Sequence, residues 1–199
     1  MPHCSHVASC LLYIDSIINK CPLKAYPCTS TDDYYSGECL KCGQSGCNTL
    51  GYYASPDKDS GTLYLDTQSI YADNRCKQNY QVIVNSDDMG DKKAKGTFTI
   101  YFQTSSKTKS STERLEKEST VFSSNLSTKY LVSLDTRLES PITSAFILYK
   151  KTWSIFTTYE DKWQFKNIEI YSADERKLVK LCPIEDFFNM SNEIEYTKC

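Results

Sequence analysis

The pattern of apolar and polar positions changes once along the chain, from a helical period to alternation. Over residues 7–21 the apolar side chains recur at spacings of three and four, which places them on one face of a helix. These positions are Val7, Cys10, Leu11, Ile14, Ile17, Ile18 and Cys21. Pro22 ends the helix, because proline has no amide hydrogen to donate. The residues that follow offer little apolar surface, so we expect this face of the helix to be exposed.

From residue 78 onward apolar side chains alternate with polar ones, which is the period of half-buried strands. The alternating segments are 80–84, 98–102, 130–134, 146–148, 168–170 and 179–181. Polar stretches separate them, and the Lys- and Ser-rich residues 105–120 are expected to form an exposed loop or a sheet edge. The pattern predicts a mostly β fold, with an antiparallel β-sandwich over residues 77–199 after a separate segment, residues 1–66.

Four cysteines lie close together in a polar stretch that favours a loop over a helix or strand: Cys28, Cys39, Cys42 and Cys47. The C-x-x-C spacing suits a four-thiolate zinc site, and the short separations also suit two local disulfides, Cys28–Cys39 and Cys42–Cys47. A zinc ribbon has a second C-x-x-C further along the chain; this sequence has none, and no nearby histidine. We therefore favour the disulfides and predict neither a metal site nor a cofactor.

The composition indicates in which cellular compartment the protein is found and which classes of partner are not expected. Ten cysteines in 199 residues suit an oxidising environment, and the N-x-S/T sequons at Asn125 and Asn189 agree with a secreted glycoprotein. The formal net charge of −2 gives no reason to expect a nucleic-acid partner or a general electrostatic attraction to anionic membranes. No apolar run is long enough to span a membrane. The N-terminus does not read as a signal peptide, so we expect the natural chain to begin upstream.

Several short motifs carry a family resemblance. C-S-H precedes the helix, K-A-Y-P-C follows it, and C-x-x-C-x4-C and then N-T-L-G-Y-Y complete the cysteine loop. This stretch resembles the end of the α/β-hydrolase domain of the pancreatic lipase family, and the remainder resembles that family's C-terminal PLAT domain, a β-sandwich. The resemblance implies that residues 1–66 are the C-terminal remnant of a truncated hydrolase domain and that residues 77–199 are a PLAT-like sandwich.

The resemblance changes the interpretation of His6, which on the residues alone is an ordinary loop histidine ahead of a helix. In this family the histidine of C-x-H is the general base of a Ser-His-Asp triad, so the resemblance assigns that role to His6. The triad serine of α/β-hydrolases lies in G-x-S-x-G, and the sequence contains no such motif. The resemblance implies a lipase or phospholipase A1 that acts on lipid esters when full-length, while this chain alone is expected to be inactive. The alternative is a PLAT module that binds lipid or protein without catalysis.

The family also suggests how the other cysteines pair. Its PLAT domain ends on a disulfide that corresponds to Cys182–Cys199. Cys21 and Cys76 match cysteines of the phospholipase A1 branch, and we expect them to pair with each other. Cys10 lies on the apolar face of the helix and is expected to be a buried thiol.

Four aromatic residues crowd one short stretch: Trp153, Phe156, Tyr159 and Trp163. In the family a tryptophan-rich loop at a similar place in the PLAT domain contacts lipid, which suits side chains with an apolar body and a polar edge. The alternative is that the two tryptophans fill the sandwich core. The partners implied by the resemblance are a lipid or lipoprotein surface and a protein cofactor bound through the PLAT domain.

Heparin is not an expected partner. The family carries a basic cluster between G-Y and the next strand, and here residues 54–61 hold Lys58 as the sole basic side chain beside two aspartates. The short basic group at residues 92–95 is interpreted as a solvated loop.

Overall fold

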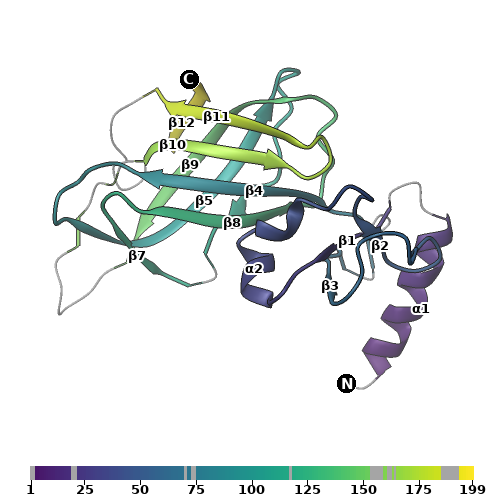
Figure 1. Ribbon diagram of the computed structural model, residues 1–199. Coiled ribbons are helices and arrows are strands. Elements are labelled where there is room, and N and C mark those ends of the chain that lie inside the picture. Colours follow the sequence, from purple (N-terminus) through teal and green to yellow (C-terminus); the bar gives the residue numbers. More distant parts are fainter. Residues whose placement is uncertain are drawn as a thin grey trace.

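The computed structural model describes residues 3–18, 22–69, 71–72, 75–116, 118–152, 159–160, 163, 165–184 and 193–199. Figure 1 shows a β-sandwich at one end of the molecule, a small irregular segment against it, and helix α1 at the other end. Within the described residues, no helix is long and apolar enough to cross a membrane.

Nine strands of the described chain form the sandwich, and their pairings are antiparallel. They are β4 (Gln78–Ser86), β5 (Lys93–Thr104), β6 (Glu113–Arg114), β7 (Thr120–Ser123), β8 (Ser127–Leu134), β9 (Ile142–Lys151), β10 (Phe165–Ser172), β11 (Lys177–Pro183) and β12 (Glu193–Lys198). The order is β6-β5-β9-β12-β11-β10-β4-β8, with β7 beside β5. In Figure 1, β4, β8, β10 and β11 form the near layer, and β5 and β9 lie behind it. The predicted mostly-β sandwich is confirmed.

Alternation along each strand sends one row of side chains into the core between the two layers. Phe98 and Phe102 of β5 are 1% and 0% exposed. The ring centroid of Phe98 lies 4.6 Å from that of Phe122 and 4.7 Å from that of Phe165. Burying one such side chain contributes about 1.5–3 kcal/mol, so this aromatic group is a main source of sandwich stability.

The edge strand β6 departs in part from the sequence prediction. It pairs with β5, as a sheet edge would, but the next residues, Leu115 and Glu116, are buried rather than exposed. The Glu116 carboxylate accepts hydrogen bonds from the Phe98 amide and the Tyr130 hydroxyl, both at 2.8 Å. These bonds offset the cost of burying an acidic group. The polar neighbours of Glu116 in the sequence gave no indication that it is buried. Burial raises the pKa of Glu116.

The N-terminal segment is made of short elements. They are α1 (His3–Ile18), β1 (Lys24–Pro27), α2 (Thr31–Tyr35), the 3-10 turn η1 (Glu38–Leu40), β2 (Asn48–Thr49) and β3 (Leu63–Tyr64). The strands form a small sheet in the order β2-β1-β3. The expectation of a loop without helix was wrong at α2, because the Ser30 hydroxyl accepts the Asp33 amide hydrogen at 3.0 Å and caps a short helix.

The disulfide loop, residues 28–47, covers the outer face of β4, β8 and β10. Tyr34 and Leu40 are 2% and 1% exposed and belong to a cluster that Leu131 and Tyr171 of the sandwich pack against. Two ion pairs flank the cluster, Lys24 with Asp174 and Lys129 with Glu38. The loop and the sandwich therefore share one small apolar core.

A glycine permits the close approach of the disulfide loop to β4. Gly37 has φ +71°, and a Cβ at this position would lie 3.0 Å from Cβ of Gln81. The opposite outer face, that of β5 and β9, has no comparable cover among the described residues, and Leu148 at its centre is 37% exposed.

Candidate functional site

The candidate catalytic residue, His6, lies near the start of α1 with its side chain exposed. Its backbone carbonyl accepts a hydrogen bond from the Ser9 hydroxyl at 2.9 Å. In the described part of the chain, the imidazole has no hydrogen-bonded carboxylate or hydroxyl. A general base needs a nucleophile within hydrogen-bond reach, so these residues do not assemble a catalytic site by themselves.

The second half of α1 is fixed to the segment that follows the disulfide loop. Asp15 is buried and forms an ion pair with Arg75. The Ser16 hydroxyl accepts a hydrogen bond from the Tyr52 amide at 2.9 Å. Gly51, at φ +86°, allows this approach, because a Cβ there would lie 2.1 Å from the Ser16 hydroxyl. These contacts set the orientation of the helix that carries the candidate histidine.

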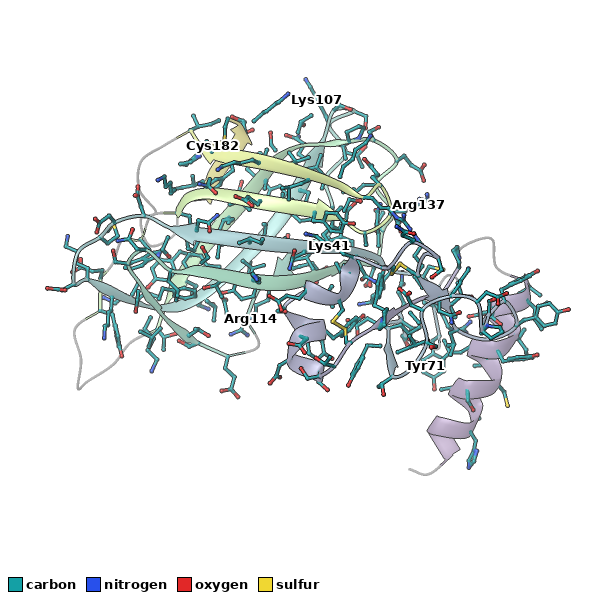
Figure 2. All side chains as sticks on the ribbon, viewed as in Figure 1. Lys41, Tyr71, Lys107, Arg114, Arg137 and Cys182 are labelled. Carbon is teal, nitrogen blue, oxygen red and sulfur yellow. A yellow bond between two sulfur atoms is a disulfide. The ribbon has the colours of Figure 1, made fainter. Side chains whose placement is uncertain are left out.

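The apolar face of α1 is exposed, as the sequence predicted. Val7, Ile14 and Ile18 are 51%, 47% and 69% exposed. The expectation of a buried thiol at Cys10 was wrong, because this face is uncovered and Cys10 is an exposed free cysteine. Figure 2 shows α1 at the end of the molecule away from the sandwich. This face is available for packing against another surface.

The clustered cysteines form disulfides rather than a metal site. The structure contains the bonds Cys28–Cys39, Cys42–Cys47 and Cys182–Cys199. Cys76 is disulfide-bonded as well, and its expected partner Cys21 lies outside the described residues. Among the residues that the structure describes, no group of His, Cys, Asp and Glu could hold a metal ion. The loop is therefore held in place by covalent links.

The structure describes two of the four crowded aromatic residues. Trp163 is 0% exposed, and its indole N–H donates to the Ser86 hydroxyl at 3.2 Å. This residue therefore occupies the sandwich core, which was the alternative to lipid contact. Tyr159 is half-buried, while Trp153 and Phe156 lie outside the described residues.

The two sequons also differ in what the structure describes. Asn125 is exposed in the turn before β8, at φ +55°. Asn189 lies outside the described residues. Glycosylation stays a prediction at both positions.

A cleft of ≈ 510 Å³ lies where the disulfide loop meets the sandwich. Its polar lining includes Asp32 of α2, Asp66, Glu113 and Arg114 of β6, and Ser133 of β8. The Ser133 hydroxyl donates to the Asn79 side-chain oxygen at 2.7 Å, and the Asp66 carboxylate lies at the longer distance of 3.4 Å. The described residues of this lining include no histidine or cysteine, and they carry charges of both signs. Arg114 is labelled at this side of the sandwich in Figure 2.

Comparison with known proteins confirms the family resemblance. Residues 1–74 match the family model described as Lipase. The chain is 33% identical over 90 residues to lipase member H of Danio rerio, and the aligned stretch covers 42% of this chain and 20% of that protein. It is 44% identical over 69 residues to human lipoprotein lipase, and here the aligned stretch covers 33% of this chain and 14% of that protein. The chain therefore spans a fifth or less of the length of these relatives.

The sandwich is also similar to a domain of solved structures. A crystal structure of a LOX variant superposes with a TM-score of 0.50 at 15% identity, covering 62% of this chain and 16% of that one. A related LOX structure, solved in complex with arachidonate, gives 0.50 over 61% of this chain. At this level of identity the likeness concerns the fold alone, and it supports a PLAT-like sandwich.

Proposed function

We propose, from the match of residues 1–74 to the lipase family, that this chain is the C-terminal part of a secreted lipase or phospholipase A1. The whole protein would hydrolyse carboxylic esters of lipids. The observation that carries the proposal is the combination, within the matched residues, of C-S-H at the start of α1 and the two bonded cysteine pairs of the disulfide loop. The disulfides and the two sequons support secretion.

In this mechanism His6 is the general base. It takes the proton from a serine hydroxyl as the oxygen attacks the ester carbonyl, and then gives that proton to the leaving alcohol. The printed sequence has no G-x-S-x-G, so the serine and the acid come from a part of the protein outside these residues. The chain's own contribution is to hold the histidine on a helix that Asp15 and Ser16 orient.

The remaining parts have separate roles in the proposal. Residues 1–66 complete the hydrolase domain, and the exposed face of α1 packs against the body of that domain. Residues 77–199, the PLAT-like sandwich, contact the lipid or lipoprotein surface and a protein cofactor. Tyr159, with Trp153 and Phe156, is the proposed aromatic contact, whereas Trp163 belongs to the buried core.

Ester hydrolysis by the full-length protein tests the role of His6. We expect His6→Ala to reduce kcat/KM by a factor on the order of 10⁴–10⁶, the range seen when a triad member is removed. His3→Ala, at the second histidine of the chain, is the matched control and should retain activity. Equal activity of the two variants would exclude His6 as the base.

The 199-residue chain provides a second test on vesicles of mixed phospholipid and triglyceride. We expect vesicle binding without hydrolysis, because the nucleophile is absent. Binding by this chain also supports the second candidate function, a non-catalytic PLAT module, which the self-contained sandwich core favours. Hydrolysis that His6→Ala abolishes would contradict the proposal, since it would require a nucleophile within these residues.

A further inference from the structure

Three lysines lie side by side on the uncovered outer face of the sandwich. The interpretation of residues 92–95 as a solvated loop was wrong for Lys93 and Lys95, which lie on strand β5. They are two residues apart, so their side chains point to the same side of the sheet. Lys150 of β9 pairs with Thr97, which places its side chain on that side too, diagonally across from Lys95. We call Lys93, Lys95 and Lys150 the lysine cluster. Lys92 precedes it in the adjoining turn.

The lysine cluster lies at the end of the sandwich that is remote from α1. The start of β5 pairs with β7, with Lys93 opposite Ser123. Figure 1 shows β7 at the left of the molecule and α1 at the right. The cluster is therefore far from the candidate histidine and from the disulfide loop.

Among the residues that the structure describes, no ion pair neutralises the charges of the cluster. In the described part of the chain, no carboxylate lies within ion-pair distance of Lys93, Lys95 or Lys150. Five other lysines do form ion pairs, namely Lys24, Lys77, Lys129, Lys177 and Lys180. Asp91 lies two residues before Lys93, and the Glu160 amide donates a hydrogen bond to the Lys93 carbonyl at 3.0 Å. Neighbouring like charges on a sheet destabilise the fold, so an external anion is what would offset them.

Tyr159 borders the cluster. The Lys95 ammonium lies 5.9 Å from the centroid of the Tyr159 ring. The Tyr159 backbone carbonyl accepts a hydrogen bond from the Lys151 ammonium at 2.7 Å. Tyrosine favours the boundary between lipid and water, because its ring is apolar and its hydroxyl is polar. A half-buried tyrosine beside lysines that form no ion pair with the described residues combines the two interactions that hold a protein at an anionic membrane surface.

We propose that the lysine cluster, with Tyr159, is a contact surface for bilayers rich in anionic phospholipid. This inference rests on the proposed function, in which the sandwich contacts a lipid surface, and it specifies that the lipid is anionic. Lysines without arginine suit a bilayer better than an acidic protein, because lysine acts as a flexible point charge whereas specific carboxylate recognition favours the arginine fork. Each lysine held near an anionic surface contributes about a five-fold gain in binding.

Vesicle flotation with the 199-residue chain tests this surface. The probes are vesicles of phosphatidylcholine alone and of phosphatidylcholine with phosphatidylserine. We expect preferential binding to the phosphatidylserine vesicles, weakened by added salt. The triple variant Lys93→Gln, Lys95→Gln, Lys150→Gln should lose roughly 100-fold in affinity for them. Because hydrolysis is not the readout, this result is independent of whether His6 acts as a catalytic base.

The control is a triple variant with the same change of charge at a distance, Lys107→Gln, Lys177→Gln, Lys198→Gln. Lys107, labelled in Figure 2, follows the opposite end of β5. This control should bind like the original chain, and thermal unfolding should show that the cluster variant is at least as stable, since it removes like-charge repulsion. Equal binding of the two triple variants, or equal binding of the original chain to both kinds of vesicle, would overturn the proposal.

Discussion

The strands on both outer faces of the sandwich have the same alternating pattern, but one face is covered by another part of the chain and the other is exposed to solvent. On β4, the outward Asn79 and Gln81 are polar, yet they are 3% and 6% exposed, because Tyr26 of β1 and Ser36 of the disulfide loop lie against them. On β9, the outward Leu148 is apolar, yet it is 37% exposed. Alternation thus shows which side chains leave the sandwich core, and it does not show whether another element covers them.

The covered face owes its stability to apolar packing more than to charge. Surface ion pairs such as Lys129 with Glu38 contribute about 0–1 kcal/mol, and their side chains are 43% and 47% exposed. Tyr34, by contrast, is buried with its ring centroid 5.6 Å from that of Tyr64. This difference predicts which substitutions detach the loop from the sandwich.

The largest effect on the covered face is expected from Tyr34→Ala. Removing a buried aromatic side chain leaves a cavity and costs about 3–5 kcal/mol in free energy of unfolding, measured by denaturant titration. Tyr34→Phe keeps the ring and is the control, with an expected change of less than about 1 kcal/mol. A similar small loss in both variants would mean that the loop is not held by this side chain.

Removing the Cys28–Cys39 bond is expected to have the next largest effect. The bond closes a loop with a sequence separation of 11 residues. The double variant Cys28→Ser, Cys39→Ser should lose about 2–3 kcal/mol in the chain-entropy model. Thermal unfolding under non-reducing conditions measures this, and unchanged stability would show that the loop is fixed by its contacts alone.

Alkaline pH should destabilise the covered face through Tyr26. Burial raises the pKa of Tyr26 to about 12, above the ordinary value near 10. The folded state then keeps a proton that the unfolded state loses, so the contribution is complete below pH 10 and disappears as pH rises toward 12. Its size is about 2–3 kcal/mol. In Tyr26→Phe the free energy of unfolding should fall less steeply over this range, and an identical slope would contradict the prediction.

The smallest effect is expected on the uncovered face. Phe146 stacks on Tyr101 with ring centroids 4.7 Å apart, and both rings are half-buried. Phe146→Ala should cost about 1 kcal/mol, because partly exposed aromatic pairs contribute less than core residues. A loss as large as that of Tyr34→Ala would show that this face is packed as tightly as the covered one.

Much of the candidate site follows from local sequence, and its long-range contacts do not. The cysteine spacings predict the disulfide loop, and together with C-S-H they carry the family resemblance from which His6 is proposed as the base, because these features lie within short stretches of the chain. Asp15 looks in the sequence like an interruption of an apolar helix face. The structure shows that it pairs with Arg75, 60 residues away, and no periodicity connects the two. Glu116 and its partner Tyr130 are hidden from sequence analysis for the same reason.

The sequence by itself determined the helix, the alternating strands and the short disulfides, since each depends on spacings within one element or one loop. Only the tertiary structure decided which faces of the sandwich are covered. It buried Trp163 in the core, left Cys10 exposed, and placed the disulfide loop on one outer face of the sandwich, while Lys93 and Lys150 on the other face are exposed and Lys95 is half-buried. Burial depends on contacts between segments that are far apart in the chain, and the periodicity of one segment does not predict which other segment will cover it.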